Sequence, residues 1–179
     1  MNSYIMGIDA STSCTGISIF KGKELVEWFE ISSNKTEWHE RLKEQKVEID
    51  KVFNKYKPSK VWMEDVPLER KSLKNLVILG AVQGFIYCMC VDHGVEINYV
   101  SPNTWRSGLN MYDGTQEGKK REALKEKAVK MANNKFGLNL VWNGARSKKT
   151  QDDVAEAILI GWYGTNIKNR SLSKSKRIE

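Results

Sequence analysis

The sequence is poor in the residues that build disulfide frameworks and zinc sites. It has three cysteines and two histidines in 179 residues, and Cys14, Cys88 and Cys90 show no C-x-x-C spacing. Structural zinc sites need clustered thiolate and imidazole ligands. The pattern therefore excludes zinc fingers and zinc ribbons, and we expect the cysteines to be buried thiols within apolar runs.

Targeting signals and long hydrophobic runs are also scarce. The longest apolar run, residues 75–91, falls short of the ~20 residues that a membrane-spanning helix needs. No leader with a basic start and an apolar centre opens the chain. We therefore expect a cytoplasmic protein with no membrane partner, built as a single domain over residues 1–168 with a basic, flexible tail over 169–179.

Positive charge is in excess. The chain carries 29 Lys and Arg against 22 Asp and Glu, which gives a formal net charge of +7 at pH 7. Such an excess favours a polyanionic partner such as nucleic acid, although proteins that bind no nucleic acid also carry charges of this size. The position of the charges relative to a site therefore matters more than their sum.

The order of the apolar patterns predicts an α/β domain. The expected strands are residues 4–9, 15–20, 23–32, 60–65 and 96–100, and the expected helices are residues 36–57, 72–92, 119–137 and 152–164, with a short helix around Trp105. The first three strands are expected to be antiparallel, within a mixed five-stranded sheet that has helices on both faces. The helix over 72–92 is apolar on nearly all sides, which is typical of a helix packed between other elements.

Four acidic residues from distant segments stand where strands end or a helix begins. Asp9 closes the first strand, Glu64 closes the fourth, and Asp153 and Glu156 share a face near the start of the last helix. Acids that meet repel one another and raise each other's pKa unless cations neutralise them. All-oxygen ligands select Mg²⁺ or Mn²⁺, and two such ions about 4 Å apart support phosphodiester hydrolysis.

Each of these acids also has a simpler interpretation. Asp9 is compatible with a turn residue, Asp152 and Asp153 with helix caps, and Glu156 with a solvated charge. Asp152 is a rival to Asp153, because it too lies about one turn before Glu156. Only the joint arrangement of the acids indicates a metal site.

Several motifs together resemble one protein family. They are "GIDASTSCTGISIF", "VWMEDVPL", "YVSPNTWRSGL", "KKREALKEKA" and "DDVAEAILIG". In content and order they resemble the RuvC-like Holliday-junction resolvases of the ribonuclease H-like superfamily, and the phage and poxvirus branches in particular. The resemblance covers residues 3–164. It implies a ribonuclease H-like fold and a homodimer, for which the helix with Gly80 and Gly84 is a candidate interface.

The resemblance also implies an activity and a set of site residues. The activity is Mg²⁺-dependent cleavage of Holliday junctions or other branched DNA, which leaves 5′-phosphate and 3′-hydroxyl ends. By position, Asp9, Glu64, Asp153 and Glu156 match the family's catalytic metal ligands for two Mg²⁺ ions, with Mn²⁺ as a substitute. Glu156 stands where many members have Asp.

Basic residues between the fifth strand and the last helix match those that hold DNA in the family. They are Arg106, Lys119, Lys120, Arg121 and Lys125, with Lys120 the first choice for a catalytic cation; Leu68 and Arg70 follow Glu64 in a loop that corresponds to a DNA-contacting segment. The simpler interpretation of the basic helix is a solvated face with pairs four residues apart. Two roles are open for Trp105: its ring stacks on an exposed DNA base, or it packs in the core. We expect it to pack in the core.

Two other functions fit the same motifs. One is a module that binds branched DNA without cutting it. The other is a fragment of an actin-like phosphotransferase, because the first motif is also similar to the phosphate-binding start of actin-like sugar kinases. Those kinases need two such domains and this chain has one, so we expect no nucleotide cofactor.

Overall fold

The structure, a computed structural model, describes residues 3–66, 73–144, 147 and 149–167. Its elements in chain order are β1 (Tyr4–Asp9), β2 (Cys14–Lys21), β3 (Glu24–Ser32), α1 (Trp38–Tyr56), β4 (Lys60–Glu64), α2 (Leu73–Asp92), β5 (Glu96–Val100), α3 (Pro102–Gly108), α4 (Arg121–Phe136) and α5 (Asp152–Asn166). The predicted order of strands and helices is confirmed. Leu68, Arg70 and the predicted tail over 169–179 lie outside the described residues.

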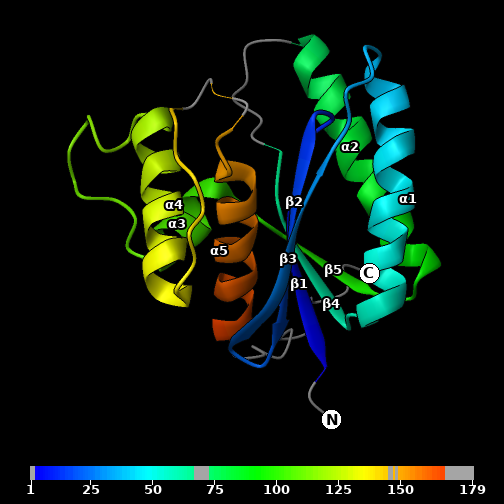
Figure 1. Cartoon of the computed structure of the whole chain (residues 1–179), viewed down its shortest axis with the longest axis horizontal. Coiled ribbons are helices and arrows are strands. Elements are labelled where there is room, and N and C mark those ends of the chain that lie inside the picture. The colour runs from blue at the N-terminus through cyan, green and yellow to red at the C-terminus, as the bar shows by residue number, and fades with distance from the viewer. Residues whose placement is uncertain (1–2, 67–72, 145–146, 148, 168–179) are drawn as a thin grey trace, which may run out of the picture.

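The strands form one five-stranded sheet in the order β3-β2-β1-β4-β5. β1, β2 and β3 pair antiparallel, whereas β4 runs parallel to both β1 and β5. Helices α1 and α2 cover one face of the sheet, and α3, α4 and α5 lie on the other (Figure 1). The expected mixed sheet with helices on both faces is therefore confirmed.

Strand alternation decides which face each side chain reaches. In β1, Met6 and Ile8 belong to the core under α1 and α2, so the intervening Gly7 and the following Asp9 point to the α5 face. In β4, Trp62 packs with the α5 core, and Glu64 has the same parity. Because Ile8 pairs with Met63 in the parallel register, both acids emerge together on the α5 face.

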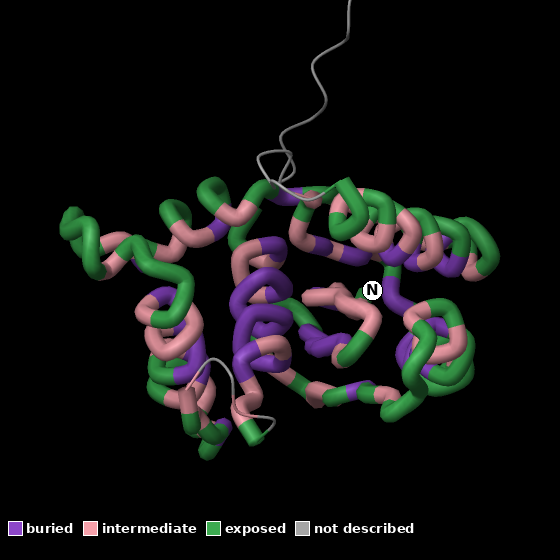
Figure 2. The backbone as a smooth tube through the Cα atoms, turned by 90° about the horizontal axis from the view of Figure 1, so that it is seen from above, coloured by how far each residue is buried: buried purple, intermediate pink, exposed green. Residues whose placement is uncertain are grey.

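Small residues let α5 lie close against the sheet. A Cβ added to Gly7 would lie 2.3 Å from the carbonyl oxygen of Ala157, and one added to Gly16 would lie 2.2 Å from the carbonyl oxygen of Asp153. The buried Ser18 hydroxyl donates to the Ala157 carbonyl at 2.7 Å. This close approach brings the first turn of α5 beside the end of β1. Figure 2 shows α5 buried along most of its length in the middle of the molecule.

Helix α2 differs from the sequence-based expectation, because only one of its sides is packed. Its buried residues are Val82, Ile86, Met89 and Cys90. The opposite side leaves Leu73, Val77, Tyr87 and Val91 exposed at 80%, 70%, 51% and 59%. The expectation of a helix packed on nearly all sides was wrong: one apolar face remains uncovered.

The glycines and one cysteine of α2 also lie away from the core. No described residue comes within 4 Å of a Cβ added at Gly80 or Gly84. Cys90 is buried and Cys14 partly buried, but Cys88 is exposed, so the expectation of buried thiols was wrong for Cys88. By length and composition α2 would also pass as a membrane-spanning helix, the one such helix in the described part of the chain.

Candidate active site

A pocket of about 1020 Å³ opens where β1 and β4 end. Its lining includes Asp9, Glu64, Asp153 and Glu156. The structure thus brings together all four acids that the sequence placed in distant segments. The sheet supplies two of them, and the first two turns of α5 supply the other two.

The acids lie close enough to affect one another's ionisation. Burial raises the pKa of Asp9 well above its usual value, and the charges of Glu156, Asp153 and Glu64 raise it further. Lys125 acts in the opposite direction. A carboxylate in this position needs more positive charge nearby if it is to stay ionised.

The turn after Asp9 is held from the other side by α1. Arg41 Nε and Gln45 Nε2 donate to the carbonyl oxygen of Thr12 at 2.9 and 3.1 Å, and Gln45 is only 1% exposed. Within the turn, the Ser11 hydroxyl accepts from the amide of Cys14 at 3.0 Å. These bonds fix the chain where it leaves β1, and with it the position of Asp9.

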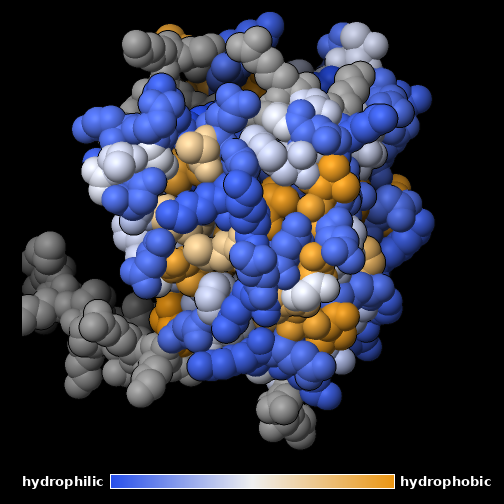
Figure 3. Space-filling view, turned by 60° about the vertical axis from the view of Figure 1, so that its left-hand side comes forward, coloured by the Kyte–Doolittle hydropathy of each residue, from blue (hydrophilic) through white to orange (hydrophobic). Residues whose placement is uncertain are grey.

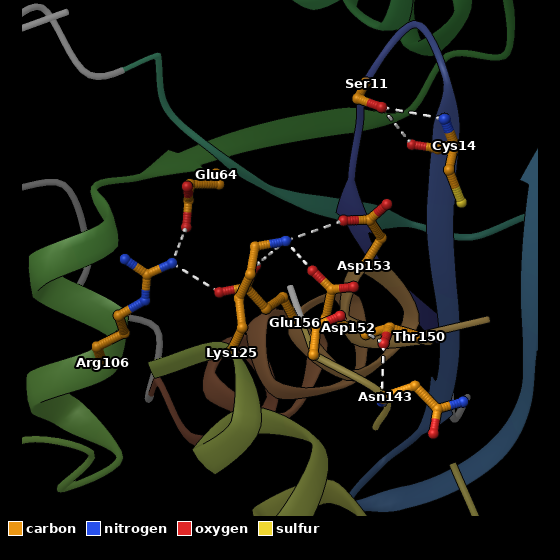
Figure 4. Close-up of polar contacts among 11 residues, drawn as sticks. Ser11, Cys14, Glu64, Arg106, Lys125, Asn143, Thr150, Asp152, Asp153 and Glu156 are labelled. Atoms are coloured by element: carbon orange, nitrogen blue, oxygen red, sulfur yellow. Dashed lines mark hydrogen bonds and ion pairs between the residues drawn. The ribbon is translucent and has the colours of Figure 1, made fainter. Parts of the chain in front are cut away.

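Glu64 contacts two neighbouring residues of α3. The indole Nε1 of Trp105 donates to Glu64 Oε2 at 2.7 Å, while Arg106 Nη2 lies 3.5 Å from the same oxygen and 2.7 Å from Glu156 Oε1 (Figure 4). Burial disfavours the charge of Arg106, but Glu156 and Glu64 outweigh it and raise the pKa of this side chain. Arg106 therefore bridges the sheet and α5.

Lys125 of α4 enters the same cluster. Its ammonium contacts Asp152 and lies 3.5 Å from Asp153 Oδ1 and 3.9 Å from Glu156 Oε2. The Lys125 side chain is 12% exposed, so the simpler interpretation of a solvated face does not hold for this residue. Of the two rival acids, Asp153 lines the pocket, whereas Asp152 is buried as a partner of Lys125.

The other predicted basic residues lie outside the cluster. Lys119 and Arg121 also line the pocket, and both are exposed. Lys120 is not among the lining residues: it precedes α4 and its ammonium pairs with Glu117 at 2.6 Å. The face of the molecule around α3 and α4 carries mainly hydrophilic residues (Figure 3).

The donor set fits a hard divalent cation. Over the described residues, no group of three or more Asp, Glu, His or Cys side chains is arranged so that it could hold a metal ion as it stands, and Arg106 and Lys125 lie among the carboxylates. Five carboxylates, Asp152 included, face these two cations. The site therefore keeps an excess of negative charge on oxygen ligands, which are the ligands that Mg²⁺ and Mn²⁺ prefer.

Sequence reasoning missed two contacts of these acids. Trp105 is fully buried, as expected, but its bond to Glu64 was not foreseen. Cys14 lies near enough to Asp153 to be affected by its charge: burial, followed by the charge of Asp153, raises the pKa of its thiol. The alternation of β2 carried a signal for Cys14, because Cys14 shares the parity of Gly16, which packs on α5.

Comparison with solved structures identifies the fold of this chain. No protein-family model matches the sequence, and no curated protein does. Thermus thermophilus RuvC in complex with a Holliday junction substrate superposes with a TM-score of 0.66 at 16% identity, over 89% of this chain and 91% of that one. The chain has the RuvC fold.

Two further resolvases share the RuvC fold. The Fowlpox virus resolvase in complex with substrate Holliday junction DNA matches with a TM-score of 0.55 at 14% identity, over 90% of this chain and 96% of that one. The yeast mitochondrial Holliday junction resolvase Ydc2 matches with a TM-score of 0.55 at 16% identity, over 92% and 80%. The expected fold is confirmed, while placement in the phage and poxvirus branch stays a prediction.

Proposed function

We propose that this protein is a divalent-metal-dependent endonuclease that cuts branched DNA, with four-way junctions as its substrate class. Its products would carry 5′-phosphate and 3′-hydroxyl ends. The observation that carries the proposal is the meeting of Asp9, Glu64, Asp153 and Glu156 in one pocket of a RuvC fold. Bound Mg²⁺ would activate water and stabilise the charge on the leaving oxygen.

The protein's own residues have distinct tasks in this proposal. The four acids would hold the ions. Arg106 and Lys125 sit at hydrogen-bonding distance from Glu156 and Asp153, where they would meet a phosphate that enters the pocket. Lys119 and Arg121 line the same pocket, where they suit contacts to flanking phosphates. In this proposal Lys125, rather than Lys120, is the cation beside the reacting phosphate.

We also propose a homodimer that forms through the exposed face of α2, with a second copy of this chain as the occupant. Leu73, Val77, Tyr87 and Val91 lie on this face, at spacings of four, ten and four residues, and no charged residue lies between Lys74 and Asp92 in the sequence. Gly80 and Gly84 leave room for a second helix to approach closely. A twofold dimer would supply the two active sites that two symmetric nicks require.

A cleavage assay tests the proposed function. The purified protein is mixed with four-way junction, fork, flap and linear duplex DNA, each with Mg²⁺ and with chelator. Cleavage of branched DNA that needs Mg²⁺, with a ligatable nick, is the expected result. Binding without cleavage would favour the non-catalytic module, and phosphoryl transfer from ATP without DNA cleavage would favour the kinase-like alternative.

A further inference from the structure

The indole of Trp105 is a polar group of the core beneath the pocket that points at Glu64. Trp105 is fully buried and packs in the cluster under α5 with residues such as Val100 and Met111. Its Nε1–H donates to Glu64 Oε2 at 2.7 Å. A buried indole N–H needs an acceptor, and here that acceptor is a carboxylate of the pocket.

The sheet register explains why the two side chains meet. Glu64 pairs with Val100 across β4 and β5, and the Asp65 amide donates to the Val100 carbonyl at 2.9 Å. The chain then turns at once into α3, whose first turn is capped by the Ser101 hydroxyl through the Thr104 amide. The first turn of α3 therefore places the Trp105 side chain beside Glu64.

A second contact strengthens the hold of α3 on this carboxylate. The Arg106 guanidinium lies over the Trp105 ring, 4.8 Å from its centroid. Arg106 also reaches Glu64 and Glu156. Trp105 therefore orients Glu64 directly through its N–H and supports the arginine that contacts the same oxygen.

We propose that Trp105 is a positioning residue for the metal site: its indole N–H fixes the Glu64 carboxylate in the orientation that binds the divalent ion. This inference rests on the proposed function, since it assigns a task within the same site. Hydrogen bonds from outside the ligand shell orient ligands in metal sites, and losing one weakens metal affinity about 10- to 100-fold. Trp105 touches neither ion nor DNA in this proposal.

Trp105→Phe removes the N–H and keeps an aromatic ring in the core. Trp62→Phe is the matched control, because Trp62 packs in the same cluster on the same strand face as Glu64, where its ring meets Tyr163. The measurement is the Mg²⁺ concentration that gives half of the maximal junction cleavage, together with the thermal shift that Mg²⁺ alone produces. We expect Trp105→Phe to raise the half-saturating concentration about tenfold, and saturating Mg²⁺ to restore the rate to within a few-fold. Trp62→Phe should behave as wild type.

A spectroscopic measurement gives a readout that a packing role would not move. In ¹⁵N-labelled wild-type protein, the indole resonance of Trp105 should shift on titration with Mg²⁺ alone, and it should sit at a different position in Glu64→Gln. This test stands even where Trp105→Phe folds poorly. An unmoved resonance, or equal Mg²⁺ affinity in Trp105→Phe and wild type, would overturn the inference while leaving the nuclease intact. Wild-type protein that neither responds to Mg²⁺ nor cuts junctions would instead remove the proposed function.

Discussion

Helices α5 and α2 are both apolar, yet one is enclosed and the other is half exposed. α5 packs on β1 and β2, with its buried residues running from Asp152 to Gly164, and its first two turns carry two of the acids of the pocket. α2 packs through one side only and leaves large apolar side chains in solvent. The comparison shows that apolar composition has two outcomes in this chain: α5 is enclosed and positions acids of the pocket, whereas α2 leaves an apolar surface uncovered, where we propose that a second copy binds.

The difference originates in the residues opposite each helix. Gly7, Gly16 and Ser18 on the sheet let the α5 backbone approach closely, so the positions of Asp153 and Glu156 are set by backbone contact. On the outer face of α2, a Cβ added at Gly80 or Gly84 would meet no other packed element within 4 Å among the described residues. Matched substitutions on the two helices should therefore differ in their effects on the cleavage rate, on dimerisation or on the free energy of unfolding.

The largest expected effect is on the rate of junction cleavage, and the test compares one acid on each helix. Asp153→Asn on α5 should lower junction cleavage by about a thousandfold or more, because it removes a proposed metal ligand and with it more than about 4 kcal/mol of transition-state stabilisation. Asp92→Asn at the exposed end of α2 should leave the rate unchanged. Rates are measured under single-turnover conditions with saturating Mg²⁺. Unaltered cleavage by Asp153→Asn would refute its assignment as a ligand.

The next effect concerns the exposed face of α2. Val77→Asp would place two like charges in the proposed interface, which should weaken dimerisation by about a hundredfold or more without unfolding the protein. Val47→Asp is the control, because Val47 is also an exposed valine, at 55%, but on α1. Sedimentation equilibrium measures both. Identical association of wild type and Val77→Asp would rule out this face as the interface.

Matched glycine substitutions should distinguish α5 from α2 by smaller changes, which appear in the free energy of unfolding. A Cβ at Gly161 of α5 would lie 2.5 Å from Ser18 Oγ and 2.8 Å from Phe20 Cε2, so Gly161→Ala should lower the free energy of unfolding by about 1–3 kcal/mol. In dilute protein that is monomeric, Gly84→Ala on α2 should raise it by up to about 1 kcal/mol, because alanine favours helix. Urea unfolding measures both changes. A loss at Gly84 as large as that at Gly161 would contradict the assigned packing.

The smallest effect is a dependence of stability on pH. Because the pKa of Asp9 is raised in the folded protein, its contribution to stability is fully present below its unfolded pKa of about 3.9 and is lost as pH rises through the folded value. In chelator, Asp9→Asn should therefore be more stable than wild type at neutral pH, and the gap should close on acidification toward pH 4. A gap that widens on acidification would show that Asp9 is stabilised as the anion.

Much of this arrangement was predictable because it follows from local patterns. Alternating and helical periodicity located the elements, and the positions of Asp9 and Glu64 at strand ends predicted their meeting. The side-chain partners were not predictable. Lys125 looked like one of several solvent-facing lysines, and only the packing of α4 against α5 shows that it turns inward toward Asp152. Likewise, the exposure of α2 depends on which neighbours the fold supplies, and its sequence is as apolar as that of a buried helix.

The central claim is that acids from β1, β4 and α5 form one divalent-ion site, and anomalous diffraction from crystals grown with Mn²⁺ tests it most directly. The account predicts anomalous density in the pocket, in contact with carboxylate oxygens of Asp9, Glu64 and at least one of Asp153 and Glu156. The density should be lost in crystals of Glu64→Gln or strongly reduced. Well-ordered crystals with no density between these carboxylates, or with Mn²⁺ bound only elsewhere on the molecule, would contradict it.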